Sequence, residues 1–165
     1  MGIAQMMLPE LKHEAANTRK VLERLKVADG KFEWRPHQKS YTMGQLASHI
    51  ANLTTWITMT INSDELDLAS NPRRQPLAGF SEVLEVFEKN LDEATKALEG
   101  VDDSLMIKKW TLRKGDHVIL ELPKAAVIRS MVFNHVIHHR GQLTVCLRLN
   151  DIAVPGLYGP SADEQ

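Results

Sequence analysis

The sequence has few of the features expected of a secreted or membrane protein. Its single cysteine, Cys146, excludes an intrachain disulfide and a cysteine-based zinc knuckle, and it fits a reducing compartment. The first residues form no continuous apolar signal segment, because Glu10, Lys12 and Glu14 interrupt them. No apolar run reaches the roughly 18 residues that a membrane span requires. We therefore expect a cytoplasmic protein with no membrane partner.

The chain also has little net charge. Its 20 Lys and Arg residues are interleaved with 21 Asp and Glu residues, which gives a formal net charge of −1 at pH 7. No basic field is present to attract phosphates, so we expect no nucleic-acid partner. The length of 165 residues fits one domain, residues 1–165, which can bury about two thirds of its unfolded surface without a structural metal. Any bound metal is therefore expected to be functional.

Hydrophobic residues at spacings of three and four define four helix-length segments. They run approximately over residues 4–26, 42–61, 81–99 and 122–150. There is no internal repeat and no low-complexity tract. The pattern predicts an all-α fold, a four-helix bundle, in which metal sites are built from inward side chains of facing helices.

Local signals mark where these helices begin and end. Thr42 and Gln45 have the spacing of a capping box, and Ser81 can cap the third helix, which Gly100 ends. Pro123 suits the first turn of the fourth helix. Residues 64–79, with Pro72 and Pro76, are predicted to form a loop. The weak pattern of residues 106–112 and 117–122, around a Lys-Gly-Asp turn, predicts a small β-hairpin before the last helix.

Three histidines interrupt the apolar lines of two helices. His135 and His139 are four residues apart, so they lie one above the other on a line that continues through Gln142, Leu143 and Cys146. A metal held by two side chains of one helix would bind weakly, and a third ligand is needed. His49 is the candidate, because it lies on the inward line of the second helix.

Each histidine also has a simpler interpretation. A single inward histidine is more often a hydrogen-bonded core residue, and an isolated His-x-x-x-His spacing is common by chance. Three core-facing imidazoles are harder to explain in this way, because each needs partners for both ring nitrogens and an apolar bundle offers few. A shared metal meets that need. The other histidines are predicted to lie at the surface, in loops or at a helix interface; they are His13, His37, His117 and His138.

Three motifs together resemble the DinB-like family of metal-binding four-helix-bundle proteins, which is itself related to bacterial thiol transferases. They are Glu33-Trp34-Arg35-Pro36 with Leu46-Ala47-Ser48-His49-Ile50, then His135-Val136-Ile137-His138-His139-Arg140-Gly141-Gln142-Leu143, and Pro155-Gly156-Leu157-Tyr158-Gly159-Pro160-Ser161-Ala162-Asp163. Their order and spacing cover nearly the full length. The resemblance implies that His49, His135 and His139 bind a divalent metal with water in the open positions, and that the protein is a homodimer.

The acidic residues needed for metal-assisted hydrolysis are missing from both histidine-bearing helices. No Asp or Glu occurs within residues 42–62 or 124–150, so a general base would have to come from Glu14 or from the third helix. Transfer of a thiol needs less, because the metal itself favours the thiolate. We therefore expect a metal-dependent transferase that acts on a small-molecule substrate and activates a low-molecular-weight thiol cosubstrate such as glutathione.

Two other functions stay open. One is metal-dependent hydrolysis of a small ester or amide, and the other is a non-catalytic, stress-associated metal-binding role. Imidazole ligands suit zinc, nickel, copper and iron, of which zinc and nickel are the preferred candidates.

Apolar residues beside the inward lines give the expected homodimer limited support. They are Trp56, Met59, Val136 and Val145, which need cover beyond one bundle core. If the loops at residues 32–40 and 151–160 cover them instead, the protein is a monomer.

Overall fold

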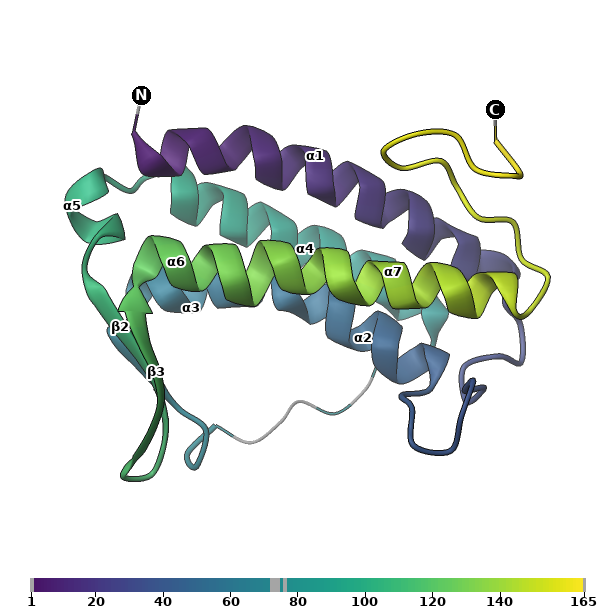
Figure 1. Cartoon of the computed structure of the whole chain (residues 1–165), viewed down its shortest axis with the longest axis horizontal. Helices are drawn as coiled ribbons and strands as arrows, with labels where there is room; N and C mark the ends of the chain where they lie inside the picture. The colour runs from purple at the N-terminus through teal and green to yellow at the C-terminus, as the bar shows by residue number, and fades with distance from the viewer. Residues whose placement is uncertain (1, 72–74, 76, 165) are drawn as a thin grey trace.

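Four long helical segments lie side by side in the computed structural model, which describes residues 2–71, 75 and 77–164 (Figure 1). The segments are α1 (Ile3–Glu23) with the 3-10 turn η1 (Arg24–Val27), α2 (Met43–Leu53) followed by α3 (Thr55–Asn62), α4 (Phe80–Glu99), and α6 (Lys124–Ile128), the π-helix η2 (Arg129–Asn134) and α7 (His135–Arg148) in succession. α1 packs against α4 and α7, and α2 packs against both α4 and α7. The prediction of a four-helix bundle is confirmed.

A small sheet lies at one end of the bundle (Figure 1). The short helix α5 (Asp103–Met106) leads into the antiparallel hairpin of β2 (Lys109–Lys114) and β3 (His117–Pro123), as predicted. A third strand, β1 (Glu65–Asp67), pairs in parallel with β2 and lies inside the predicted loop. Three residues are too few to leave a pattern in the sequence. The rest of that loop includes Pro72 and Pro76, which lie outside the described residues.

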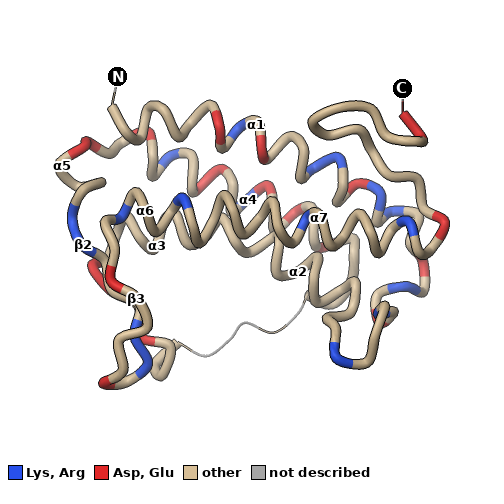
Figure 2. The backbone as a smooth tube through the Cα atoms, viewed as in Figure 1, with Lys and Arg blue, Asp and Glu red and all other residues tan. Residues whose placement is uncertain are grey.

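The core runs along the bundle in two large clusters of buried apolar side chains. One joins α1, α2, α4 and α7, and the other joins α1, α3, α4 and η2. Charged residues lie over α1, α4 and the hairpin, whereas α2 and α3 carry none (Figure 2). In the described residues, no helix is both long enough and apolar enough to cross a membrane.

The start of α2 follows the prediction. Thr42 Oγ1 accepts the Gln45 N–H at 3.1 Å, and Gln45 Oε1 accepts the Thr42 N–H at 2.9 Å. Gly44 permits the ring of Phe32 to lie against this first turn, since a Cβ at Gly44 would come within 2.3 Å of the ring. The capping box and this contact together fix where the helix that carries His49 begins.

Two other predicted starts are wrong. The N-cap of α4 is Gly79, two residues before Ser81, because Glu82 Oε2 accepts the Ala78 N–H at 3.0 Å and Phe80 packs against another ring. Pro123 ends β3 and is the N-cap of α6, so the last helix begins at Lys124.

The segment predicted as one helix over residues 42–61 is interrupted at Thr54. Thr54 lies between α2 and α3, and the Thr55 hydroxyl donates to the Asn52 carbonyl at 2.8 Å. Threonine hydroxyls that bond to nearby carbonyls compete with the regular helix ladder. The hydrophobic spacing continues across the break, which is why the sequence did not reveal it.

The last helix contains a π-turn that the periodicity did not predict. η2 inserts an extra residue into the helix, and one residue corresponds to a rotation of about 100°. After the turn, the buried face therefore centres on Val136 and Arg140 in place of His135 and His139. Leu143 and Cys146 are buried as expected, together with Leu147. Gln142, which we expected on the inward line, is exposed.

The apolar residues expected to need outside cover differ in their surroundings. Val136 is 5% exposed inside the bundle's own core, so that expectation was wrong for this residue. Trp56 and Met59 are half-buried, and Trp56 packs near Trp110 with ring centroids 6.1 Å apart. Val145 is 58% exposed on α7. Of the four residues, only Val145 stays largely uncovered within one chain.

Candidate metal centre

Three imidazoles from two helices converge beside the core. His49 comes from α2, and His135 and His139 come from the first two turns of α7. One ring nitrogen from each lies within 4.8 Å of the others, and the Nε2 atoms of His49 and His135 are 3.3 Å apart. Two nitrogens that bind one zinc ion at about 2.0–2.1 Å with a tetrahedral angle between them lie as far apart as the Nε2 atoms of His49 and His135. These three histidines could hold a metal ion.

The π-turn brings the two histidines of α7 to this position. Without the extra residue, the line from Ile128 and Val132 would continue directly through His135 and His139 into the core. With it, Val136 and Arg140 take the most buried positions, and the two histidines lie at the edge of the core, half-buried and close to α2. The imidazoles can thus share an ion and still leave one side open to solvent.

Hydrogen bonds at the far ring nitrogens orient the imidazoles. His135 Nδ1 lies 3.3 Å from the Met131 carbonyl oxygen, and His139 Nδ1 lies 2.8 Å from Gln142 Oε1. Both partners are acceptors, so each Nδ1 carries the proton and donates. The corresponding Nε2 atoms then have lone pairs available for a metal, as in metal sites whose histidines are held by outer hydrogen bonds.

Burial keeps these imidazoles neutral. It lowers the pKa of both His135 and His139, because removal from water disfavours the charged imidazolium. The hydrogen bonds to Met131 and Gln142 act in the opposite direction but are the smaller influence. At pH 7 both rings are therefore in the form that binds metals.

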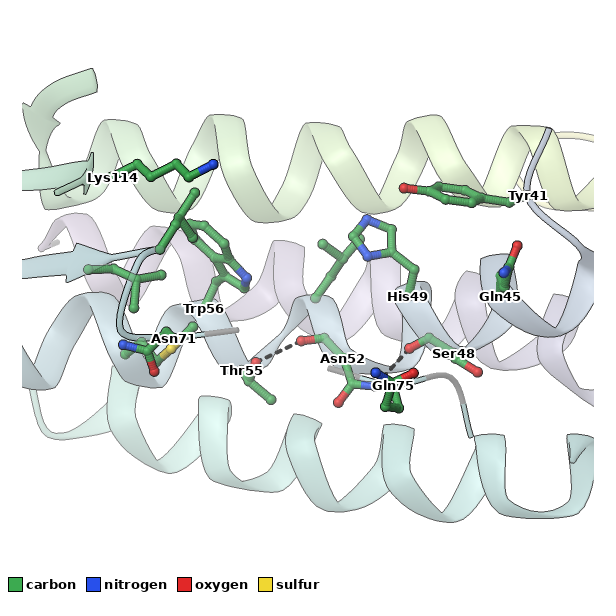
Figure 3. Close-up of a pocket in the computed structure, with 14 residues that line it drawn as sticks. Tyr41, Gln45, Ser48, His49, Asn52, Thr55, Trp56, Asn71, Gln75 and Lys114 are labelled. Atoms are coloured by element: carbon green, nitrogen blue, oxygen red, sulfur yellow. Dashed lines mark hydrogen bonds between the residues drawn. The ribbon is translucent and has the colours of Figure 1, made fainter. Parts of the chain in front are cut away.

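A cavity of about 640 Å³ opens beside His49 (Figure 3). It extends along one face of α2 and α3, and Leu68, Asn71, Gln75 and Lys114 also border it. Its 14 lining residues, all in the described part of the chain, include no Asp or Glu. They are Tyr41, Gln45, Ser48, His49, Asn52, Leu53, Thr55, Trp56, Met59, Leu66, Leu68, Asn71, Gln75 and Lys114.

The carboxylates considered as general bases lie elsewhere. Glu14 Oε2 accepts from Arg140 Nη2 at 2.6 Å and from the Tyr158 hydroxyl at 2.7 Å. It is thus already engaged in a buried ion pair. The buried side chains of α4 are Val83, Phe87, Asn90, Ala94 and Leu98, and none is acidic. Neither source named from the sequence supplies a base to the cavity.

Sequence reasoning missed the buried ion pair of Glu14 and Arg140, to which the hydroxyl of the exposed Tyr158 is hydrogen-bonded. Arg140 is 1% exposed and also donates to the Glu14 carbonyl and to Thr18 Oγ1, at 3.0 and 3.1 Å. Its neighbours in sequence pointed to a metal site, and its charge suggested a surface position. These hydrogen bonds connect the C-terminal segment that contains Tyr158 to α1 and α7. In the sequence, Arg140 directly follows His139. Both Arg140 and Tyr158 lie in the motifs that suggested the family, which was the one available signal.

The remaining histidines lie where we expected them. His13, His37, His117 and His138 are all exposed. The His138 ring packs edge-on against His139, with centroids 4.9 Å apart. It lies outside the group of three whose nitrogens converge.

A helical bundle with a histidine cluster at the edge of its core and an adjoining cavity is the class of protein that this fold and site define. The DinB family model matches residues 2–165, and the chain belongs to that family. The Bacillus subtilis (strain 168) protein YrdA, described as uncharacterized, is 24% identical over 166 residues, which cover 95% of this chain and 89% of YrdA.

Solved structures support the same fold. A DinB-like protein from Bacillus subtilis, YjoA, has a TM-score of 0.70 at 14% identity, with 97% of this chain and 99% of that one covered. A DinB-like protein from Bacillus cereus ATCC 10987 has a TM-score of 0.69 at 21% identity, with 92% and 95% covered.

Proposed function

We propose that this protein, as one domain spanning residues 1–165, is a metal-dependent transferase that activates a low-molecular-weight thiol. His49, His135 and His139 are the proposed ligands of a divalent ion, with zinc or nickel preferred. The observation that carries the proposal is the convergence of three ring nitrogens, two of them oriented by outer hydrogen bonds, beside a cavity without carboxylates.

Three histidine ligands would leave the metal ion at least one coordination position that a small molecule could occupy. Three neutral imidazoles leave the ion its full positive charge, and a bound divalent ion would supply Lewis acidity that favours a thiolate over a thiol. The histidines lie at the edge of the core, so a small molecule can approach from the cavity. The protein's own contribution is to hold the three rings fixed and neutral.

The thiol has to come from solution. Cys146, the sole cysteine, is buried, and burial raises the pKa of its thiol. A thiol with a raised pKa is a poor nucleophile at neutral pH. A small thiol that enters through the cavity is the simpler source.

Hydrolysis is the weaker alternative. A metal-dependent hydrolase commonly uses a nearby carboxylate as general base. Glu14 is held by Arg140 and Tyr158, and the lining residues in the described part of the chain contain no acid. A non-catalytic, stress-associated metal-binding protein is expected not to bind a thiol at its metal. This distinguishes that role from the proposed transferase.

We also propose a homodimer. Two apolar residues at the end of α7 are largely uncovered: Val145 and the C-cap residue Leu149, four residues apart, are each 58% exposed. A symmetric contact through this end of the helix would cover them in both chains.

Cobalt substitution tests the proposed activity. Addition of glutathione to the cobalt-loaded protein is expected to produce an intense sulfur-to-cobalt absorption band. S-methylglutathione, which lacks the thiol, is the matched control and should leave the spectrum unchanged. A panel of small thiols that produces no band would refute thiol activation.

A further inference from the structure

The cavity contains a second feature at the end away from the histidines. We propose that Lys114 and Trp56 form an anion subsite, which selects elongated ligands that carry a carboxylate at the end opposite their thiol. This inference rests on the proposed function for the thiol end of the ligand. It adds the chemical class of the substrate.

The two ends of the cavity are separated by a defined stretch of helix. Trp56 follows His49 by seven residues along α2 and α3, which corresponds to about 10 Å. Lys114 extends from the end of β2 over Trp56, with its amine directed towards the end that holds His49 (Figure 3). A ligand that reaches both ends must therefore be elongated.

The charges around Lys114 leave its amine available. Arg113, next to Lys114, binds the carboxylates of Glu65 at 2.7 Å and Asp67 at 2.6 Å, and Asp67 also accepts the Gly115 N–H at 3.0 Å. Within the described residues, Lys114 forms no ion pair, and it is the one charged residue that lines the cavity. A metal at the histidines would make both ends positive. The field of such a cavity favours an anion.

The lining around Trp56 is largely apolar. Leu53, Met59 and Leu66 line the cavity together with the indole of Trp56, which Trp110 supports at a ring-centroid distance of 6.1 Å. Between His49 and Trp56 the lining also includes the polar side chains of Asn52 and Thr55 (Figure 3). An alkyl or similarly apolar linker buries surface there at a gain of about 25 cal/mol per Å². Thiol, apolar linker and carboxylate are thus the three parts of the expected ligand.

Matched synthetic probes test this arrangement. 8-Mercaptooctanoate has an extended chain of about the required length. 8-Mercaptooctanol has the same thiol and linker without the charge, and 3-mercaptopropionate has the charge without the length. Calorimetric titration of the cobalt-loaded protein would give each Kd, and the sulfur-to-cobalt band would report thiol ligation separately. Octanoate, titrated into the metal-free His135→Ala/His139→Ala variant, probes the anion subsite alone.

Lys114→Met is expected to weaken 8-mercaptooctanoate about five-fold, the usual size for a partly exposed ion pair, and to leave 8-mercaptooctanol unchanged. Lys12→Met is the matched control, since it removes the same charge from an exposed position of α1. The variant should fold, because Lys114 is exposed. 3-Mercaptopropionate should be insensitive to Lys114.

The outcomes separate the two proposals. A thiolate band combined with equal binding of the acid and the alcohol, or with no effect of Lys114→Met, overturns the anion subsite and leaves thiol activation standing. Lys114-dependent binding of octanoate without any thiolate band overturns thiol activation and supports the subsite. Binding of none of the probes overturns both.

Discussion

Removal of two of the three histidines separates the candidate metal site from the fold. We expect the variant His135→Ala/His139→Ala to lose metal binding and to keep its helical circular dichroism. Neither ring belongs to the core clusters, and burial opposes their charged form. The remaining His49 offers a single nitrogen, which binds a divalent ion weakly.

The size of the effect follows from linkage. An ion that binds only the native state, present at 100 times its Kd, stabilises that state by about 2.7 kcal/mol. For a domain of this length, this corresponds to a rise in Tm of roughly 5–10 °C. The wild type should show this rise on addition of zinc or nickel, and the double variant should show none. Elemental analysis of the purified proteins gives the metal content directly.

His138→Ala is the matched control for the double variant. His138 lies on the same helix and contacts His139, but it is exposed and outside the converging group. Its removal should leave both the metal content and the Tm shift as in the wild type. Full metal content in the double variant, or loss of the ion in the control, would show that the three histidines have been wrongly assigned as ligands.

Three further predictions concern pH, the buried ion pair and assembly. Because burial lowers the pKa of His135 and His139, metal affinity should persist at pH 7 and fall as the pH drops through roughly 6. The metal-free fold should begin to lose stability as the pH falls below about 6.5, because the unfolded chain then binds protons that the folded chain does not. A competition titration that finds undiminished affinity at pH 4 would point to carboxylate ligands. Arg140→Met leaves Glu14 buried without its charged partner, so urea denaturation should show a loss of about 3–5 kcal/mol, against less than about 1 kcal/mol for the exposed Arg148→Met. An equal loss in both variants would contradict the structural role of the buried pair. Light scattering at micromolar concentration should give twice the 18.6 kDa of one chain, and the single-chain mass would refute the dimer.

Much of the bundle could be predicted because burial follows helical periodicity. The capping box at Thr42 and Gln45 also has a local cause, and it was found in advance. The break at Thr54 could not be found in this way, because the apolar spacing is the same on both sides of it.

The candidate site was predictable in its residue identities and less so in its surroundings. His49, His135 and His139 follow from spacing, and the structure brings them together. Arg140 was missed because its partner Glu14 is 126 residues away, and no local pattern indicates that a charge will be neutralised by a distant element. The cavity was missed for the same reason, since its walls come from separate elements.

The π-turn makes the site sensitive to the geometry of the helix as well as to its residue types. Arg129, Ser130 and Asn134 are exposed, so their substitution should be tolerated as long as the π-turn is kept. If the same residues formed a regular α-helix, α7 would be rotated by about 100° relative to α6, and the histidines would no longer meet His49. A relative that retains all three histidines and the same chain length but forms a regular helix here would therefore be expected to have no metal site, although an inventory of its ligands would suggest one.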